Sequence, residues 1–358
     1  MIYLNVAGLS PFNPEVQQEI RATLKQFERL LYSDEGIHYY RETLQRCRQA
    51  LADWLRIEDE NSVAFVPNAT TASSLVLSRI NWKPGDHILT TTHENSTVLK
   101  EILGLQAREV HIQTLDPKSP DELETQIKQY FHSKQVRAIL ISHVSHIDGR
   151  IFPIERISQI TQNDQVLLIV DGAQAVGHIP IHFHEWQPDA YFFPGHKWCA
   201  GPLGTGALLL GKQFVERNER DRNSGKGNSQ PLWLDFELGT QNIGLIAGLA
   251  KACTLKQQAQ LEPPPHVGYR EKWKTCLQAQ RGLRILEWDG SHSPSIISFT
   301  CMDSESEEFM RRTASTHSLS WKSFSHPSQL SNLSIRLSWS VSTSQEELSS
   351  ALNFFPTR

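Results

Sequence analysis

The sequence predicts an α/β fold built on a mostly parallel sheet, with a smaller α+β part towards the C-terminus. Between residues 62 and 210, short apolar runs alternate with helical stretches. Continuous apolar strands separated by helices are typical of a parallel sheet that is covered on both faces. Such sheets bind ligands beyond the carboxyl ends of their strands. The predicted strands are residues 62–66, 87–91, 138–143, 166–171, 189–193 and 206–210.

Two helices are predicted before the first of these strands. Asn13 followed by Pro14 is a typical helix start, because asparagine caps the first turn and proline fits within it. Apolar residues then recur at helical spacing, which predicts two amphipathic helices in succession. The apolar positions are 16, 20, 24, 27 and 31 in the first helix, and 40, 44, 47, 51, 54 and 55 in the second.

The C-terminal part follows the proline-rich segment 262–266, which we interpret as a boundary between domains. Two strands are predicted after it, at 295–300 and 333–340. Thr343 and Glu346 then have the spacing of a capping box, which predicts that the last helix begins there.

The chain has 358 residues, which is enough for a large core and for two domains. We predict a large α/β domain at 14–255. The small α+β domain is predicted to combine residues 1–13 with 256–358.

The composition is that of an ordinary globular protein, with 39% hydrophobic and 21% charged residues. A net charge of −4 gives no electrostatic case for a nucleic-acid partner or an anionic membrane. The longest apolar runs, such as 166–170, are too short to span a bilayer. The five cysteines are scattered and form no CxxC pair, so we expect no structural metal site, no disulfide framework and a cytoplasmic location.

Asp171 is the first candidate for chemistry, because it ends a strand that is otherwise wholly apolar. A carboxylate at that place is costly without a partner. It is either a turn or helix-cap residue, which aspartate at a strand end often is, or a carboxylate held at the ligand-binding edge of the sheet.

Lys197 is the second candidate. A lone lysine is usually a solvated surface residue. The aromatic and apolar residues around this one, including Phe193 and Trp198, indicate a partly buried setting. Desolvation lowers the pKa of an amine and makes it a nucleophile towards carbonyls, so lysine is the natural Schiff-base residue.

The third candidate is the segment 66–75, in which small and hydroxyl residues join a strand to a helix. Such a junction either only caps the helix or lets its backbone N–H groups hold a phosphate. The three candidates together meet the needs of pyridoxal phosphate (PLP), which takes a lysine, a carboxylate for its ring nitrogen and a phosphate cradle.

With these residues in view, the chain resembles the class V aminotransferases, which are PLP enzymes of fold type I. The segments that carry the resemblance are VDGAQAVGH at 170–178, GHKWCAGPLGTG at 195–206, NATTA at 68–72, SHVSHIDGR at 142–150, LGTQN at 238–242 and SIRLSWS at 334–340. The N-terminal IYLNVAG at 2–8 is similar too. The resemblance implies the PLP-dependent transferase fold, with a mostly parallel seven-stranded sheet in the large domain.

The resemblance also implies roles for individual residues. Lys197 would form the Schiff base and then move protons, and Asp171 would pair with the ring nitrogen. Arg336 would bind the substrate α-carboxylate through its planar fork; the alternative is an ion pair on the surface of a strand. The remaining cofactor residues would be Ala69, Thr70, His93, Gln174, His196 and Thr240, with Thr240 supplied by the partner subunit of a homodimer. The remaining substrate residues would be Ala7, Gly8 and His146.

The chain departs from the family pattern in several places. The family covers the cofactor ring with an aromatic residue, often histidine, from a segment like EHNS; here His93 and Glu94 stand in the reverse order. Pro194 replaces a frequent phosphate-binding hydroxyl, and His146 replaces asparagine or tryptophan. His143 matches a family histidine, but a structural role at a strand end is equally expected.

The most useful departure concerns cysteine. Cysteine desulfurases of the family carry a mobile cysteine before the carboxylate-binding arginine, and the segment 320–336 has none. We therefore favour a C–S lyase that eliminates the β-substituent of a cysteine-type amino acid. The alternatives are an amino-acid epimerase or aminotransferase, a desulfurase without the usual cysteine, and a PLP-fold binding protein that has lost catalysis.

Overall fold

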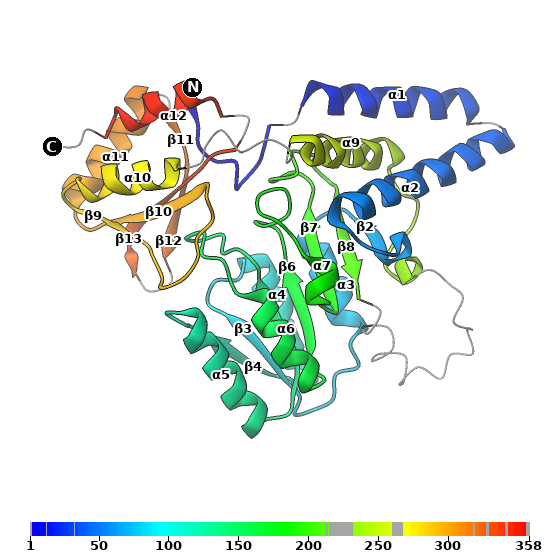
Figure 1. Ribbon diagram of the computed structural model, residues 1–358, viewed down its shortest axis with the longest axis horizontal. Coiled ribbons are helices and arrows are strands. Elements are labelled where there is room, and N and C mark those ends of the chain that lie inside the picture. Colours follow the sequence, from blue (N-terminus) through cyan, green and yellow to red (C-terminus); the bar gives the residue numbers. More distant parts are fainter. Residues whose placement is uncertain are drawn as a thin grey trace.

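The computed structural model describes residues 2–11, 13–31, 33–211, 214, 232–259, 268–317, 319–326, 329–340 and 343–355. A seven-stranded sheet forms the centre of the molecule, and a four-stranded sheet lies beside its upper edge (Figure 1). The proline-rich segment 262–266, interpreted above as a boundary, lies outside the described residues. The predicted domain limit at 255 falls inside a helix, Ile243–Ala259, and the division into domains stays a prediction.

The large sheet has the strand order β2-β8-β7-β6-β5-β3-β4. Neighbours from β4 to β7 pair in parallel, and β8 is antiparallel to both of its neighbours. The predicted mostly parallel, seven-stranded α/β sheet is therefore confirmed. Its strands are β2 (Val63–Val66), β3 (His87–Thr91), β4 (His111–Leu115), β5 (Val136–Ser142), β6 (Leu167–Asp171), β7 (Ala190–Pro194) and β8 (Gly206–Leu210).

Helices cover both faces of this sheet, as its continuous apolar strands require. One face packs against α3 (Ala69–Arg79) and α4 (Ser96–Gly104). We call this the α3/α4 face; it carries alternate strand residues such as Leu140 and Ile169. The other face packs against α2 (Asp34–Leu55), α5 (Pro120–Ser133), α6 (Ile154–Asn163), α7 (Phe183–Trp186) and α9 (Ile243–Ala259).

The N-terminal helices form where the sequence predicts them. The helix α1 (Pro14–Leu30) begins at the predicted cap, because the Asn13 side chain accepts a hydrogen bond from the Glu15 amide at 2.8 Å. It lies against α9, and the two run along the outside of the molecule beside α2 (Figure 1).

The small sheet is antiparallel, with the order β12-β13-β10-β9. Its core holds residues from three helices and, from the N-terminus, Leu4. Its elements are α10 (Tyr269–Gln278), β9 (Leu283–Ile285), β10 (Ile296–Cys301), α11 (Ser304–His317), β12 (Lys322–His326), β13 (Gln329–Ser338) and α12 (Gln345–Leu352). The short strand β1 (Ile2–Tyr3) pairs in parallel with β11 (Leu319–Ser320). The smaller α+β part is thus present.

The start of α12 differs from the prediction by one residue. Ser344 caps the helix, and its hydroxyl and the Glu347 carboxylate make the reciprocal bonds of a capping box. The predicted pair, Thr343 and Glu346, was wrong, because the Thr343 hydroxyl instead accepts a hydrogen bond from the Ser340 amide at 3.3 Å. Two overlapping Ser/Thr-x-x-Glu patterns are present, and the turn from Ser340 to Thr343 occupies the hydroxyl of the first.

Candidate functional site: a lysine, a carboxylate and an arginine at the sheet edge

Asp171 and Lys197 meet at the carboxyl edge of the large sheet. Asp171 is the last residue of β6, and Lys197 lies in the turn between β7 and β8. The Asp171 carboxylate is 3% exposed and accepts a hydrogen bond from the Ala173 amide at 2.8 Å. Burial raises the pKa of Asp171, and the charge of Lys197 opposes that rise. Burial likewise lowers the pKa of Lys197 to about 8, against the charge of Asp171. The two groups therefore act on each other directly.

The turn that carries Lys197 is fixed by close backbone packing. The Ala200 amide donates to the Lys197 carbonyl at 2.8 Å, and the Gly195 amide donates to the Thr205 carbonyl at 2.7 Å. Gly177 packs against this turn with φ 84°, and a Cβ there would lie 2.7 Å from the Trp198 carbonyl. Glycine at 177 is required both for its left-handed backbone and for that approach.

Gln174 connects the turn to the N-terminal segment. Its amide nitrogen donates to the Ala7 carbonyl at 2.9 Å, and its amide oxygen accepts from the Trp198 indole at 2.6 Å. His178 stacks on the Trp198 ring at 3.6 Å between centroids. One N–H of Gln174 is left over after these bonds, so its contact with a cofactor ring oxygen stays a prediction.

Arg336 reaches the same place from β13. Its guanidinium donates to the His146 carbonyl at 2.6 Å and to the Asn5 side-chain oxygen at 3.4 Å. The side chain is 5% exposed, and no carboxylate pairs with it among the residues that the structure describes. Its Nε is buried without a partner. A buried guanidinium without a counter-ion is costly, which is the condition of an anion site and not of a surface ion pair.

His146 lies in the electrostatic field of both Arg336 and Lys197. Burial and the charges of these two cations together lower the pKa of His146 to about 3, so the imidazole is neutral. Its Nδ1 is buried without a partner. Ala7 and Gly8 lie beside this group in the N-terminal segment, where the Gly8 amide donates to the Asn5 carbonyl at 2.9 Å. The predicted substrate residues therefore come together, and their contacts with substrate stay predictions.

The predicted phosphate residues lie at the N-terminus of α3. Asn68 caps this helix by accepting the Thr71 amide at 2.8 Å, and Ala69 and Thr70 form its first turn. The Thr70 hydroxyl is 2.9 Å from that of Thr97, in the first turn of α4. Two helix N-termini thus adjoin on one face of the sheet, and both favour an anion. The cap interpretation is correct and does not compete with a phosphate role.

His196 adjoins Lys197 and is partly buried. Its Nδ1 is buried without a partner, and its carbonyl accepts the Ser10 amide at 2.9 Å. Burial lowers the pKa of His196, and the charge of Lys197 adds to that shift, so the ring is a neutral donor or acceptor. Its phosphate contact stays a prediction.

His93 and Glu94 are both buried and face different partners. His93 Nδ1 is 3.0 Å from the Ser145 hydroxyl and 3.8 Å from the Asp148 carboxylate. Glu94 accepts the Thr91 hydroxyl at 2.7 Å and the Ser142 hydroxyl at 2.6 Å. His93 therefore lies towards the turn that carries His146, and its contact with the cofactor stays a prediction.

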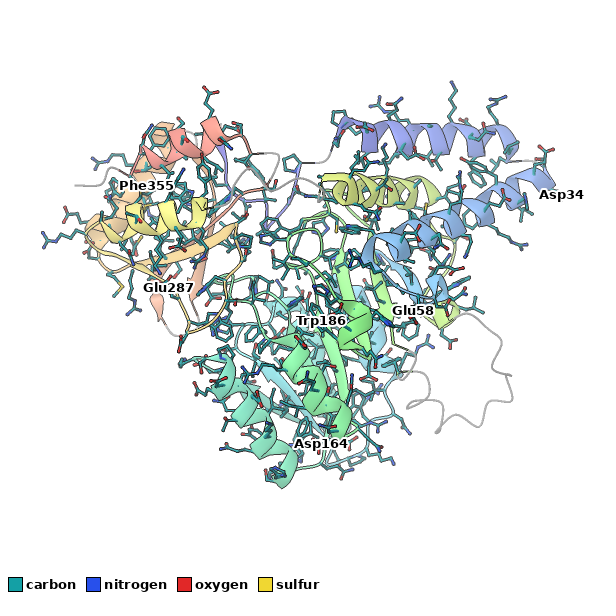
Figure 2. The ribbon with its side chains drawn as sticks, viewed as in Figure 1. Asp34, Glu58, Asp164, Trp186, Glu287 and Phe355 are labelled. Carbon is teal, nitrogen blue, oxygen red and sulfur yellow. The ribbon has the colours of Figure 1, made fainter. Side chains whose placement is uncertain are left out.

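Two residues lie apart from this group. Thr240 is exposed beside the start of α9, where the Tyr40 hydroxyl receives the Gln241 amide at 2.6 Å. His143 points to the opposite face of the sheet, where its Nδ1 is 2.8 Å from the Tyr191 hydroxyl. Its ring meets that of Trp186, labelled in Figure 2, edge-on at 5.1 Å. His143 is therefore a structural histidine.

The sequence missed three residues that complete the site: Asn5, Thr97 and Ser142. Thr97 had a weak signal, since it is a hydroxyl residue in the first turn after the cap Asn95. Ser142 ends a strand as Asp171 does, and the two are partners in the sheet register. Asn5 had no local signal, because only the pairing of the N-terminus with the small sheet brings it to Arg336.

The residues present fit PLP. A lysine of lowered pKa, a buried carboxylate and adjoining helix N-termini match its aldehyde, ring nitrogen and phosphate. Three buried polar atoms beside them lack partners: Nδ1 of His146, Nδ1 of His196 and Nε of Arg336. Buried polar atoms are normally satisfied, so these mark a place for a polar ligand. Within the described ranges, no group of metal-ligating side chains gathers.

This fold and this group of residues define a PLP-dependent enzyme of fold type I. The chain belongs to the aminotransferase class-V family, which it matches over residues 2–347. The predicted family and its cofactor class are thereby confirmed. No helix in the described part of the chain is long and apolar enough to cross a membrane.

Several known proteins are similar to the chain. It is 26% identical over 266 residues to a cysteine desulfurase IscS of Dictyoglomus turgidum, covering 71% of this chain and 63% of that protein. A structure of the cystine C–S lyase C-DES with its reaction product cysteine persulfide superposes with a TM-score of 0.81 at 22% identity, covering 98% and 96%. An apo structure of a cysteine desulfurase from Thermococcus onnurineus superposes with a TM-score of 0.80 at 21% sequence identity, covering 98% of this chain and 93% of that chain. The match thus spans less than two thirds of the Dictyoglomus protein.

Proposed function

We propose that the protein is a PLP-dependent C–S lyase, which removes a sulfur substituent from Cβ of a cysteine-type amino acid. The observation that carries the proposal is the convergence of Lys197, Asp171 and Arg336 at one sheet edge. The nearest cysteine in sequence, Cys199, is buried, and its thiol donates to the Val176 carbonyl at 3.5 Å. The similarity to proteins named cysteine desulfurase and cystine C–S lyase supports a sulfur-containing substrate.

The chain's own residues have complementary tasks in this reaction. When bound, PLP supplies the electron sink for negative charge at the substrate Cα. Arg336 holds the substrate carboxylate, and the buried setting of its guanidinium makes that contact strong. Lys197, with its pKa of about 8, takes the Cα proton near neutral pH and returns it to the product. Asp171 holds a proton at the ring nitrogen, and neutral His146 orients the substrate from between Arg336 and Lys197.

The cysteines support a lyase over a persulfide-forming desulfurase. Burial raises the pKa of Cys47 to about 12 and of Cys301 to about 11, and it raises those of Cys253 and Cys276 as well. A thiol in that state is a poor nucleophile. The segment before Arg336 forms β12 and β13, an antiparallel pair. All five cysteines are free, which is why we propose a reducing, cytoplasmic location.

We further propose that the enzyme is a homodimer in which Thr240 serves the partner subunit. Thr240 is exposed and makes no contact with Lys197 or Asp171 among those found in the described residues. Around it α1, α2 and the start of α9 line a groove of about 470 Å³ with exposed apolar side chains. These include Leu24, Leu31 and Ile37, which are 45%, 49% and 56% exposed. An apolar face of this kind next to a site residue fits a second copy of the chain.

A substrate panel with product identification tests the reaction. The PLP-loaded protein is incubated with cysteine, cystine and cysteine conjugates, and pyruvate, sulfur products, alanine and Cα-deuterium loss are measured. A lyase yields pyruvate with sulfide or persulfide. Alanine with transferred sulfur identifies a desulfurase, and deuterium loss with neither product identifies an epimerase. Protein that takes up PLP, forms a borohydride-stable bond at Lys197 and turns over no substrate is a binding protein, and contradicts the lyase.

A further inference from the structure

Glu94 is a buried carboxyl group that the proposed reaction does not use. It lies in the turn between β3 and α4 and is 4% exposed. Within the described residues its carboxyl group has no basic partner; the Thr91 and Ser142 hydroxyls and the Ser142 backbone amide donate to it. A carboxyl group held in this way is expensive to bury as an anion. A positively charged ligand beside Glu94 would stabilise this anion.

The direction of these bonds shows which way the carboxyl group is held. The Thr91 hydroxyl accepts the His93 amide at 3.1 Å, so its own hydrogen is directed to Glu94 Oε1 at 2.7 Å. The Ser142 hydroxyl lies 2.6 Å from the other oxygen, Oε2. Two strand ends, those of β3 and β5, thus fix both oxygens of Glu94 in place.

Ser142 places Glu94 next to Asp171. Ser142 and Asp171 are partners in the parallel register of β5 and β6, so their side chains share a face of the sheet. That face is the α3/α4 face, because Leu140 and Ile169, two residues earlier on each strand, lie in its core. Adjacent strands are about 4.8 Å apart, so Ser142 and Asp171 are neighbours on this face, and the charge of Asp171 acts on Glu94.

We propose that Glu94 is a second carboxyl group at the ring-nitrogen end of the cofactor pocket, coupled to Asp171 through Ser142. The inference rests on the proposed PLP function and deepens it. A protonated ring nitrogen at Asp171 places a positive charge beside Glu94, and the glutamate then ionises. The O–H bond of Glu94 breaks, its proton passes to solvent, and the anion stays beside the cationic ring. Asp171 and Glu94 together keep the ring nitrogen protonated.

The electrostatics of the free site agree with this geometry. Burial, with a smaller contribution from the charge of Asp171, raises the pKa of Glu94 to about 7 against the hydrogen bonds from Ser142 and Thr91. Lys197 faces Asp171 from the turn after β7, and His93 on the same turn as Glu94 faces Asp148. The first turns of α3 and α4 carry no acidic residue. Below about pH 7 Glu94 is therefore neutral until the ring binds.

The sign of the pH effect follows from this state. A bound cation lowers the pKa of Glu94, so cofactor binding below pH 7 releases a proton from it. The affinity for PLP then rises with pH up to about 7, by at most about tenfold per pH unit from this group. Lys197, with its pKa of about 8, adds a rise of the same sign that extends up to about pH 8 and that does not depend on Glu94.

Calorimetry of PLP binding tests the inference. PLP is titrated into apo wild type and Glu94→Gln at about pH 6 and 8, in buffers of different ionisation enthalpy, which counts the protons released. Glutamine keeps the shape, accepts from Thr91 and donates to Ser142. We expect Glu94→Gln to release one proton fewer than wild type when PLP binds near pH 6. The variant should also lose the part of the rise in PLP affinity up to pH 7 that comes from Glu94, and keep the part that comes from Lys197. Ser142→Ala removes a hydrogen-bond donor to the Glu94 anion. The rise in PLP affinity that comes from Glu94, which we call the lower step, is therefore expected to move to higher pH.

The control is Asp86→Asn. Asp86 is a buried carboxylate just before β3, 2% exposed, which accepts the Lys83 amide at 2.8 Å far from the Lys197 site. It is expected to release protons as wild type does. Proton release by Glu94→Gln equal to that of wild type, or an unmoved step in Ser142→Ala, overturns the inference and shows a structural role. Wild type that binds no PLP overturns the proposed function as well, whereas PLP binding without lyase products leaves the inference on Glu94 intact.

Discussion

Burial shifts the pKa values of the charged groups in the site away from their ordinary values. Burial lowers the pKa of Lys197 to about 8 and that of Arg336 to about 10, and it raises the pKa of Asp171. Each of these shifts is a cost to folding that a bound zwitterion with matching charges would remove. The site is therefore electrostatically strained in the free protein, in the direction that favours a charged ligand.

Arg336→Lys tests whether the guanidinium is the carboxylate-binding group. Lysine keeps the charge and loses the planar fork, so two parallel hydrogen bonds become one. We expect KM to rise about tenfold to a hundredfold, the cost of about 1.4 to 3 kcal/mol that a charged hydrogen bond carries, with a smaller change in kcat.

The control is Arg284→Lys, at an exposed position of β9. Its steady-state constants are expected to match wild type. Equal KM values for wild type and Arg336→Lys would contradict the assignment, and show that the guanidinium only joins β13 to His146 and Asn5.

At the scale of elements, the site is assembled by three segments that meet. The turn after β6 carries Gln174, the turn after β7 carries Lys197, and the N-terminal segment lies across both. Its Ala7 amide donates to the Ser338 hydroxyl of β13 at 2.9 Å, and its Ala7 carbonyl receives Gln174. Val6 and Ala7 also share a core cluster with Trp198 and Ile296, from the two sheets. The N-terminal segment therefore connects the small sheet to the lysine turn.

Gly177→Ala tests this packing. A Cβ at 177 would meet the Trp198 backbone at 2.7 Å, and φ is 84°. We expect a loss of unfolding free energy by denaturant titration and weaker PLP uptake, because the Lys197 turn must move.

Gly85→Ala separates the clash from the backbone strain. Gly85 has φ 88°, with nothing within 4 Å of an added Cβ. Alanine at 177 should cost about 1–3 kcal/mol more than alanine at 85, the usual cost of overpacking. Equal costs, with PLP uptake unchanged, would show that Gly177 contributes only its backbone freedom.

At the scale of the whole molecule, the apolar groove beside Thr240 lies at the opposite end from the small sheet. The three helices that line it run along the outer edge, where Asp34 marks the start of α2 (Figure 2). Glu237 precedes the Thr240 segment and is anchored by a buried ion pair to Arg48 of α2. This end of the molecule exposes apolar side chains beside a buried ion pair, which fits the proposed subunit interface.

Ile37→Glu is expected to weaken the proposed dimer. The change places a charge in an apolar face, and we expect sedimentation at micromolar concentration to shift from dimer to monomer. PLP affinity should fall with it, since the proposed site takes Thr240 from the partner subunit. Met302→Glu, at an exposed apolar position of the small domain that is 44% exposed, is the control and should leave the dimer unchanged. A wild type that sediments as a monomer contradicts the shared site.

The local sequence predicted most of the large sheet, and the strand that it missed has a physical explanation. The edge strand β4 (His111–Leu115) has exposed and partly exposed side chains except for its last residue, so it lacks the continuous apolar run of the other six. Its pairing with β3 through backbone hydrogen bonds makes it a strand. Side-chain patterns report burial, and an edge strand has little of it.

By itself the sequence determined the α/β class, six strands of the large sheet, and the identity of Lys197, Asp171 and Arg336 as candidates. The class, the strands, Lys197 and Asp171 follow from apolar periodicity and from residue types whose chemistry is specific, whereas Arg336 follows from the family resemblance. Only the tertiary structure decided which of them meet, that Arg336 has no counter-ion among the described residues, and that Glu94 bonds to Ser142, the register partner of Asp171. The physical reason is that pKa shifts and unpaired charges arise from burial by neighbours distant in sequence, which no local pattern records.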